Sequence, residues 1–492
     1  MQKKITIAPI TRLEGHGKID IFLSDEGDVE DAYLQVVELR GFEKFCERRP
    51  VEELPRITPK ICGVCPGAHH MASAKACDAV YGVTIPNAAL KLRRLYLDAH
   101  IVHSHLLHFF ALAAPDFVPG AGATKKDRNL LGLVDKVGAA LGKEVIQNRG
   151  YAQKIQGMIA GHPIHPVAAL PGGMSKPLSE TERQEIRTMA ESLKAFATKA
   201  LSIFENKVLG DEANAEVVGG DTYYHETYYA GLVDDDQRVN FYDGKVRIVG
   251  PDGSEFAQFQ PADYLEHIAE RVEPWSYLKL PYLKNVGWKG FSDGPNSGVF
   301  RVNSLARLNV ATGMATPGAQ EAYERMYDYF GTKPVHHTLA YHWARLIECL
   351  YGAEEVLRLA DDPEISSPDV RVVSSSEPKE GIGVVEAPRG TLYHHYVTGA
   401  RGHVHSVNLI VATAQNNAAM NMSVKKAAQH LIKKGQVSDE LLDRVEMAFR
   451  AYDPCLACAT HALPGQMPLE ITLFREHEPW RKIVRGGSVL SQ

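Results

Sequence analysis

The first forty residues alternate between apolar and polar side chains along three short runs. A period of two places successive side chains on opposite faces of the chain, as in a β-strand with one buried face. A polar loop at residues 11–16 separates the first two runs, and the Asp- and Gly-containing residues 25–28 predict a turn before the third. We therefore expect an N-terminal β region with strands at residues 4–10, 17–23 and 32–37.

Beyond the first cysteines the period becomes helical. The clearest segment is residues 88–113, where apolar residues such as Leu92, Leu95, Ala99 and Val102 recur at helical spacing. Further helices are expected at residues 69–81, 127–160, 178–208, 318–331, 335–361, 414–434 and 438–451. Strands are expected at residues 370–373, 383–386, 392–397 and 403–411, and a hairpin at residues 245–256. The predicted fold is mainly α with smaller β-sheets (α+β), a central helix bundle with an N-terminal β region.

Composition narrows the function classes. The 492 residues carry a formal net charge of -6 and show no Lys/Arg-rich run, which argues against nucleic-acid binding. No apolar run of about 18 residues predicts a membrane span, and residues 1–7 do not resemble a secretory signal. The length is typical of two to four domains, although one large enzyme domain is also compatible with it.

Cysteine usage is more informative. Of the seven cysteines, Cys46, Cys77 and Cys349 are isolated in apolar or mixed sequence and are expected to be ordinary buried thiols. The other four form two Cys-x-x-Cys pairs, Cys62/Cys65 and Cys455/Cys458. Four thiolates usually indicate a metal. The first pair precedes a predicted helix, a position that favours thiolate charge.

Several sites could use four thiolates. A structural zinc normally closes a local loop, whereas residues 66–454 lie between these pairs. Two redox Cys-x-x-Cys motifs lack a thioredoxin-like context, and an iron–sulfur cluster remains an alternative. The segment 88–113 also carries four histidines, whose spacings are common on a helix surface or in a core and lack carboxylate support, so that we expect packing or hydrogen bonding: His100, His103, His105 and His108.

Five motifs occur in a fixed order and decide between these alternatives. They are Arg12-Leu13-Glu14-Gly15-His16, Arg40-Gly41-Phe42-Glu43, Cys62-Gly63-Val64-Cys65 with His69, Glu386-Ala387-Pro388-Arg389-Gly390, and Asp453-Pro454-Cys455-x-x-Cys458-x-x-His461. Together they resemble the large subunit of nickel–iron hydrogenases, from residue 5 to about residue 461. One departure is Lys60, where the family usually has Arg; the charge is kept but the fork geometry is lost.

The resemblance implies a catalytic centre built where the two chain ends meet. Cys62 and Cys455 would be terminal nickel ligands, and Cys65 and Cys458 would bridge nickel to an iron carrying CO and cyanide. Soft thiolates suit such metals. Further family positions would line the pocket of the diatomic ligands, with Arg389 also a candidate base in H2 splitting: Pro388, Arg389 and Thr413.

The resemblance also implies a proton route and a second metal. Cys455 would be the first proton acceptor and Glu14 its relay. Glu43 and His461 would bind Mg²⁺, with the backbone carbonyl near Leu409 as a third ligand. A carboxylate, an imidazole, a carbonyl and waters make a reasonable octahedral shell.

The resemblance further implies processing at the C-terminus. Residues 1–461 would form the catalytic domain, and residues 462–492 would be a tail that an endopeptidase removes after His461 once nickel-insertion proteins have acted. Pro464, Gly465 and Pro468 are expected to keep this stretch extended and accessible.

Electrons must leave through a partner, because three isolated cysteines cannot build an iron–sulfur cluster in this chain. The family supplies an iron–sulfur small subunit, and the motifs look most like its cytoplasmic multimeric subgroup. Those enzymes add flavin-bearing or heterodisulfide-reductase partners; we favour the viologen-reducing, heterodisulfide-linked branch over the NAD(P)-linked one. The alternatives are a non-catalytic H2 sensor and a respiratory complex I relative, which lacks the ligands present here.

Overall fold

The computed structural model describes residues 3–120, 122–124, 127–273, 275–462, 469–475 and 478–485. Its N-terminal strands β1 (Lys3–Ile7), β2 (Gly17–Leu23) and β3 (Val29–Val36) form an antiparallel sheet in the order β1-β2-β3. The predicted β region is therefore confirmed, although β1 ends before Pro9, which cannot donate to a strand ladder. The sheet contacts the distant helix α14 (Ala412–Leu431) through the backbone N–H of Leu34, which donates to Asn421 Oδ1 at 2.8 Å.

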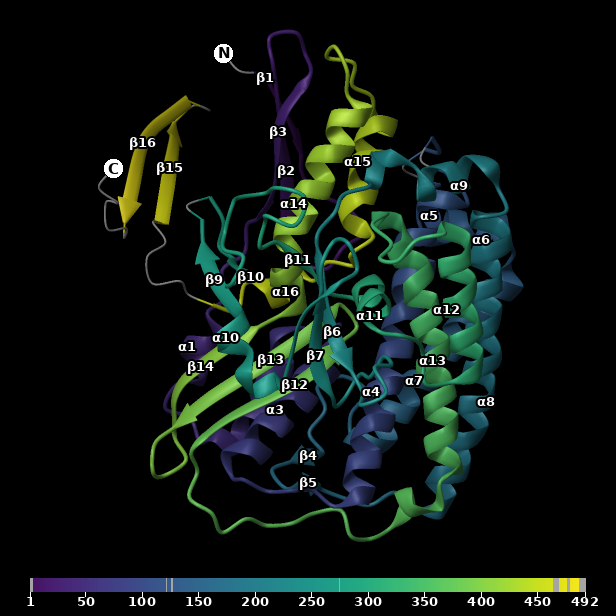
Figure 1. The fold of residues 1–492 in the computed structure, drawn as a ribbon, viewed down its shortest axis with the longest axis vertical. Coiled ribbons are helices and arrows are strands. Elements are labelled where there is room, and N and C mark those ends of the chain that lie inside the picture. Colours follow the sequence, from purple (N-terminus) through teal and green to yellow (C-terminus); the bar gives the residue numbers. More distant parts are fainter. Residues whose placement is uncertain are drawn as a thin grey trace.

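Long helices form a bundle along one side of the molecule (Figure 1). They are α4 (Asn87–Leu107), α7 (Ala139–Ala160), α8 (Glu180–Ile203), α12 (Pro317–Phe330) and α13 (Tyr341–Asp361). Helix α13 packs against both α4 and α8. The helix expected at 88–113 ends in a π-helical segment, His108–Ala113, and the one expected at 127–160 breaks at Gly138 into α6 (Leu130–Val137) and α7. Gly138 has φ +91°, outside the helical region.

Helix α3 (Pro66–Val80) lies on an antiparallel sheet of β12 (Glu380–Ala387), β13 (Gly390–Thr398) and β14 (Val404–Ile410). Two glycines of β12 make this approach possible, because a Cβ on Gly381 or Gly383 would lie 2.3 or 2.1 Å from a carbonyl oxygen of α3. The chain then runs through α14 (Ala412–Leu431) and α15 (Asp439–Arg450) to α16 (Leu456–Ala459). In this way α16 and its preceding residue Cys455 come to lie beside the start of α3.

A second core lies around a four-stranded sheet, ordered β11-β6-β7-β8, beside α11 (Ser304–Val310). The hairpin predicted at 245–256 is confirmed as β7 and β8. The remaining elements are short: β6 (Tyr228–Val233), β7 (Lys245–Val249), β8 (Glu255–Phe259), β11 (Phe300–Arg301), α1 (Phe42–Cys46), α2 (Leu54–Ile57), α5 (Ala114–Phe117), α9 (Glu212–Gly219), α10 (Tyr264–His267), β4 (Ala169–Leu170), β5 (Gly173–Met174), β9 (Ile268–Val272) and β10 (Lys279–Leu283).

Two regions differ from the sequence-based picture. The strand predicted at 370–373 is wrong: the run contacts β5 (Gly173–Met174) through a single bridge, Arg371 to Gly173, which is too short a pairing to form a strand. Val373, at the end of the run, is 80% exposed. After Ala462, strands β15 (Leu469–Arg475) and β16 (Glu478–Arg485) form an antiparallel hairpin (Figure 1). The expectation for Pro464, Gly465 and Pro468 falls outside the described residues. Within the described parts of the chain, no helix is long and apolar enough to cross a membrane.

Candidate metal centre

The two cysteine pairs meet in the interior. Cys62 follows a 3-10 turn and Cys65 is the N-cap of α3, whereas Cys455 is the N-cap of α16 and Cys458 lies within it. The Sγ atoms of Cys62 and Cys455 are 3.2 Å apart, and those of Cys65 and Cys458 are 3.0 Å apart. All four sulfurs lie within 4.8 Å of one another and all four residues are buried. Among the described residues, this is the one His/Cys/Asp/Glu group of three or more suited to a metal.

The chemistry of these thiols fits a bound metal. Burial raises the pKa of Cys455 and Cys458 well above the usual thiol value, whereas hydrogen bonds, first that from Cys455, lower the pKa of Cys62. Four thiolates therefore cannot share this dry space by themselves. A cation at their centre removes the repulsion and deprotonates its ligands.

Glu14 reaches the centre from the N-terminal loop. Its Oε2 accepts hydrogen bonds from Cys455 Sγ at 2.9 Å and from the backbone N–H of Ala457 at 3.1 Å. Its backbone carbonyl accepts from Leu456 N–H at 3.0 Å. Burial, and next the charge of Cys62, raise the pKa of the Glu14 carboxyl. The side chain is only partly buried, so it bridges a buried thiol and the exterior.

Arg389 approaches the same sulfurs from the sheet. It lies in the two-residue turn between β12 and β13, where Ala387 pairs with Gly390. Its Nε donates to the Asp453 carbonyl at 2.6 Å and its Nη2 to Asp453 Oδ1 at 2.9 Å. Nη1 of Arg389 and Oδ2 of Asp453 are buried without a protein partner, which leaves polar atoms beside the thiols for a further group.

Thr413 and Pro388 occupy different places around the centre. Thr413 lies in the first turn of α14, and its Oγ1 accepts from the Cys455 backbone N–H at 3.1 Å. The Pro388 carbonyl accepts from Arg307 Nη2 at 3.2 Å. The structure thus brings Thr413 to the thiol segment, whereas the Pro388 carbonyl binds Arg307.

The residues expected to bind Mg²⁺ also meet. His461 Nε2 lies 2.6 Å from the Leu409 carbonyl oxygen and 3.4 Å from Glu43 Oε1, which accepts from Leu409 N–H at 2.7 Å. Lys279, which the sequence did not suggest, places Nζ 3.2 Å from Glu43 Oε1 and 2.6 Å from Asn408 Oδ1. Although burial pushes the pKa of Glu43 upward, its bond to His461 and the Lys279 charge bring it to about 2.

The three histidines of α4, and His108 at the start of the π-helical segment that follows it, have structural partners. His100 Nδ1 contacts Gln156 Oε1, His103 the Arg149 carbonyl, and His108 the Arg450 carbonyl. His105 Nε2 lies 3.1 Å from Glu348 Oε2, so it does have a carboxylate partner, supplied by α13 rather than by neighbouring sequence. The expectation of packing and hydrogen bonding is confirmed. The isolated thiols Cys46, Cys77 and Cys349 are buried and free, as predicted.

Other residues around the centre received no role from sequence. His69 Nε2 lies 3.5 Å from Cys458 Sγ, and Asp453 binds Arg389. Both residues lie within the cysteine motifs quoted above, and this closeness in sequence to the cysteines could have suggested that they contact the centre. Arg40 donates to the Ile61 carbonyl beside Cys62. Lys60, the departure from the family pattern, is exposed.

Comparisons with known proteins agree with this geometry. The family model described as nickel-dependent hydrogenase matches residues 40–131 and 233–461, and a HoxL-like model matches residues 4–39. A protein of Archaeoglobus profundus that is named as an iron-sulfur subunit of an F420-non-reducing hydrogenase is 50% identical over 485 residues, covering 98% of this chain and 100% of that protein. The NAD-reducing hydrogenase HoxS subunit beta of Cupriavidus necator is 39% identical, covering 96% and 98%.

A solved structure is also similar. The crystal structure of an NAD+-reducing NiFe hydrogenase in the H2-reduced state superposes with a TM-score of 0.87 at 38% identity, covering 93% of this chain and 99% of that one. These relatives are named as hydrogenases, which favours the catalytic interpretation over a sensor. The chain belongs to the nickel-dependent hydrogenase family, as the catalytic large subunit of a NiFe hydrogenase.

Proposed function

We propose that Cys62, Cys65, Cys455 and Cys458 would hold a nickel–iron centre whose iron would carry CO and cyanide. The observation that carries this proposal is the buried group of four thiols with Glu14 bonded to one of them. When bound, the metals supply the site at which H2 is polarised and split. The unpaired Arg389 Nη1 supports a donor role toward cyanide and a candidate base role, and Thr413 is proposed as a second cyanide donor.

The protein's part is proton transfer and exclusion of water. We infer that Cys455 Sγ passes a proton to Glu14 Oε2, across 2.9 Å, and that Glu14 releases it outward. The raised pKa of Glu14 supports this, because a carboxyl must be able to hold the proton it relays. The complete burial of Cys455 keeps bulk water from the thiol.

We further propose Mg²⁺ at Glu43, His461 and the Leu409 carbonyl. A carboxylate, an imidazole and a carbonyl suit such a cation. Lys279 Nζ contacts Glu43 in this structure, so Mg²⁺ would have to take over that charge pairing. Elemental analysis before and after exposure of the purified protein to EDTA tests the site; protein that never contains stoichiometric magnesium contradicts it.

The electron partners follow from chemistry and relatives. The seven free cysteines leave only isolated thiols outside the centre, so electrons must pass to an iron–sulfur small subunit. The relative with 50% identity is named F420-non-reducing, which supports the viologen-reducing, heterodisulfide-reductase-linked branch over a deazaflavin acceptor. The NAD-linked alternative is supported by the NAD-reducing relative at 39% identity. Cytoplasmic location, flavin-bearing partners, a maturation endopeptidase and nickel-insertion proteins belong to the same proposal.

Two measurements test this function. Metal analysis of the purified protein should give nickel and iron, and stoichiometric zinc without either would contradict the centre. Mass spectrometry of copurifying subunits, combined with H2-dependent reduction of viologen and of NAD, should separate the two electron-acceptor branches.

A further inference from the structure

The turn that carries Arg389 is held by its backbone. Arg307 donates through Nη1 to the Ala387 carbonyl at 3.0 Å and through Nη2 to the Pro388 carbonyl at 3.2 Å. Asn416 Nδ2 donates to the carbonyl of Arg389 itself at 3.2 Å. Three successive carbonyls of one short turn therefore each accept from a buried side chain. A two-residue turn forms without such side-chain hydrogen bonds. We therefore assign them to fixing the position of the turn relative to α11 and α14.

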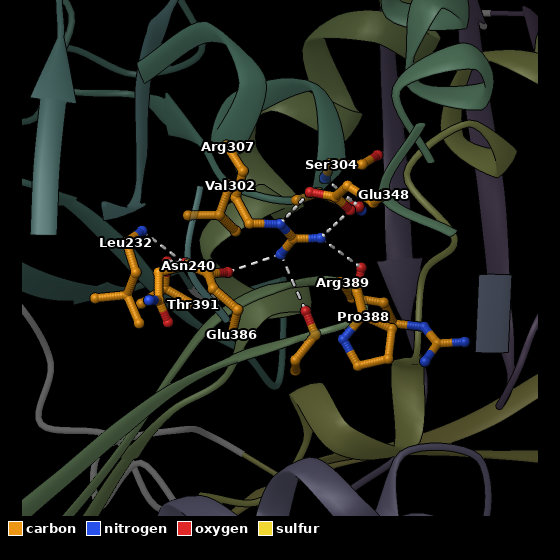
Figure 2. A network of polar contacts seen from close by, with 12 residues as sticks. Leu232, Asn240, Val302, Ser304, Arg307, Glu348, Glu386, Pro388, Arg389 and Thr391 are labelled. Carbon is orange, nitrogen blue, oxygen red and sulfur yellow. Dashed lines mark hydrogen bonds and ion pairs between the residues drawn. The ribbon is translucent and has the colours of Figure 1, made fainter. Parts of the chain in front are cut away.

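Arg307 is itself buried, and all its side-chain N–H groups are hydrogen-bonded. It is 0% exposed and lies on α11, between Glu348 of α13 and Glu386 of β12, both also 0% exposed. Its five N–H groups all have partners: Glu348 accepts twice, Glu386 Oε2 accepts at 2.7 Å, and the two turn carbonyls accept the rest. Figure 2 shows Arg307 at the centre of these contacts, with the Arg389 side chain pointing away from them.

The facing segment is held in the same way. Arg345 Nη2 donates to the Ala451 carbonyl at 2.9 Å, Asn303 Nδ2 to the Tyr452 carbonyl at 2.6 Å, and Arg389 Nε to the Asp453 carbonyl at 2.6 Å. This segment leads directly to Cys455. The Arg389 guanidinium thus joins two segments whose carbonyls are each bound by buried side chains, and its Nη1 alone is left without a partner.

We propose that Arg307 is a positioning residue of the hydrogenase: by binding the carbonyls of Ala387 and Pro388, it sets where Arg389 presents its unpaired Nη1 beside the four thiols. Glu348 and Glu386 balance its charge, so that the cation is retained in a dry interior. A catalytic group held by buried bonds to rigid elements keeps its geometry, whereas a displacement of about 1 Å can lower turnover about 10²-fold. This role of Arg307 rests on the proposed nickel–iron centre.

The substitution Arg307→Lys tests it. Lysine keeps the charge between Glu348 and Glu386, but its single ammonium cannot reach both carboxylates and both carbonyls. We expect nickel and iron content per chain to stay at the wild-type level. The infrared bands of the iron-bound CO and cyanide should shift, and turnover per nickel at saturating H2 should fall at least ten-fold with KM for H2 changed less than two-fold.

The matched control is Arg358→Lys, on the same helix as Glu348, where the arginine side chain is 56% exposed. Bands and turnover should remain those of the wild type. Arg307→Lys protein with wild-type bands and turnover per nickel would overturn the proposal, as would a loss explained entirely by missing metal.

If Arg307→Lys does not fold, Asn416→Asp replaces it, because it removes the donor to the Arg389 carbonyl and keeps the acceptor for Val302 N–H. Wild-type protein lacking nickel and CO/cyanide bands would instead contradict the proposed function.

Discussion

The side chains at the metal centre differ in their exposure to solvent. Cys455 is 0% exposed, whereas Glu14, bonded to its sulfur, is only partly buried. Burial, and next the charge of Cys62, raise the pKa of the Glu14 carboxyl and so help it keep a proton. A partly exposed carboxyl in contact with a buried thiol is placed as the proposed relay requires.

Replacement of Glu14 by Gln should stop that relay. Glutamine keeps the size and an acceptor for the Ala457 N–H, but it cannot take up and release a proton. We expect H2 uptake to fall about 10²-fold or more, with nickel and iron content unchanged by elemental analysis. Glu38→Gln, on a carboxylate bonded to the exposed His16, is the control and should keep full uptake. Undiminished uptake in Glu14→Gln protein would refute the relay.

At the scale of elements, the contact of α3 with β12 brings the first cysteine pair to the sheet that carries Arg389. This contact depends on glycine, since the helix backbone lies where a side chain would otherwise stand. A Cβ on Gly383 would lie 2.1 Å from the Ala72 carbonyl oxygen. The helix would have to lift from the sheet to admit it.

Gly383→Ala should therefore destabilise the protein by at least about 3 kcal/mol, the upper part of the usual range for overpacking. Chemical unfolding of the metal-free protein measures the change. The control is Gly150→Ala in α7, where a Cβ meets nothing within 4 Å; it should stabilise by up to about 1 kcal/mol through helix propensity. Equal stabilities for the two variants would show that the helix–sheet contact is not limiting.

Helix α4 confers a pH dependence on stability. Burial lowers the pKa of His100 and His105 to about 4 and that of His103 to about 3. An unfolded histidine titrates near ~6.5, so below that pH the unfolded chain binds protons that the folded chain does not. Stability is therefore highest above ~6.5 and falls as the pH decreases toward 4.

The prediction is a falling free energy of unfolding between pH 7 and 5, measured by urea titration of the metal-free protein. Each of these histidines contributes up to about 1.4 kcal/mol per pH unit below its unfolded pKa. His105→Gln, whose amide can still donate to Glu348, should reduce the slope by about one proton. A slope identical to that of the wild type would mean that His105 is already charged in the fold.

For the whole molecule, the segment from Cys455 to His461 packs against residues from the N-terminal part of the chain, among them Glu14 and Cys62. His461 is 1% exposed and seated against Leu409, with Ala462 and the β15–β16 hairpin still attached. Seating of this segment therefore does not require a free C-terminus at His461. Removal of residues 462–492 would act on the order of assembly rather than on the final geometry.

We predict that nickel-loaded, active protein ends at His461 and that metal-free protein retains residues 462–492. Intact-mass spectrometry of both forms measures this, and a chain expressed without residues 462–492 serves as the comparison. Active, nickel-containing protein at full mass would show that the tail is retained.

The sequence by itself determined the features that depend on residues close together in the chain, namely the regular elements and the short motifs. Periods of two and 3.6 identify the N-terminal strands and the bundle helices, because burial of one face imposes them locally. The exception at residues 370–373 shows the limit, since β-branched residues form a strand only where pairing continues along the run, and here it stops at one bridge to Gly173. The cysteine pairs and the motif glutamates are equally local signals. They point to the location of the centre, but not to the distant residues whose hydrogen bonds and ion pairs position it.

The tertiary structure decided the partners that lie far along the chain. Asp453 binds Arg389, Glu348 binds both His105 and Arg307, and Lys279 lies against Glu43. Each pair comes from elements separated by tens to hundreds of residues, and no periodicity relates them. Their geometry arises only when packed elements exclude water and every buried charge must find a partner. For this reason the sequence alone singled out the four cysteines that the fold brings together, whereas the buried network around Arg389 required the fold.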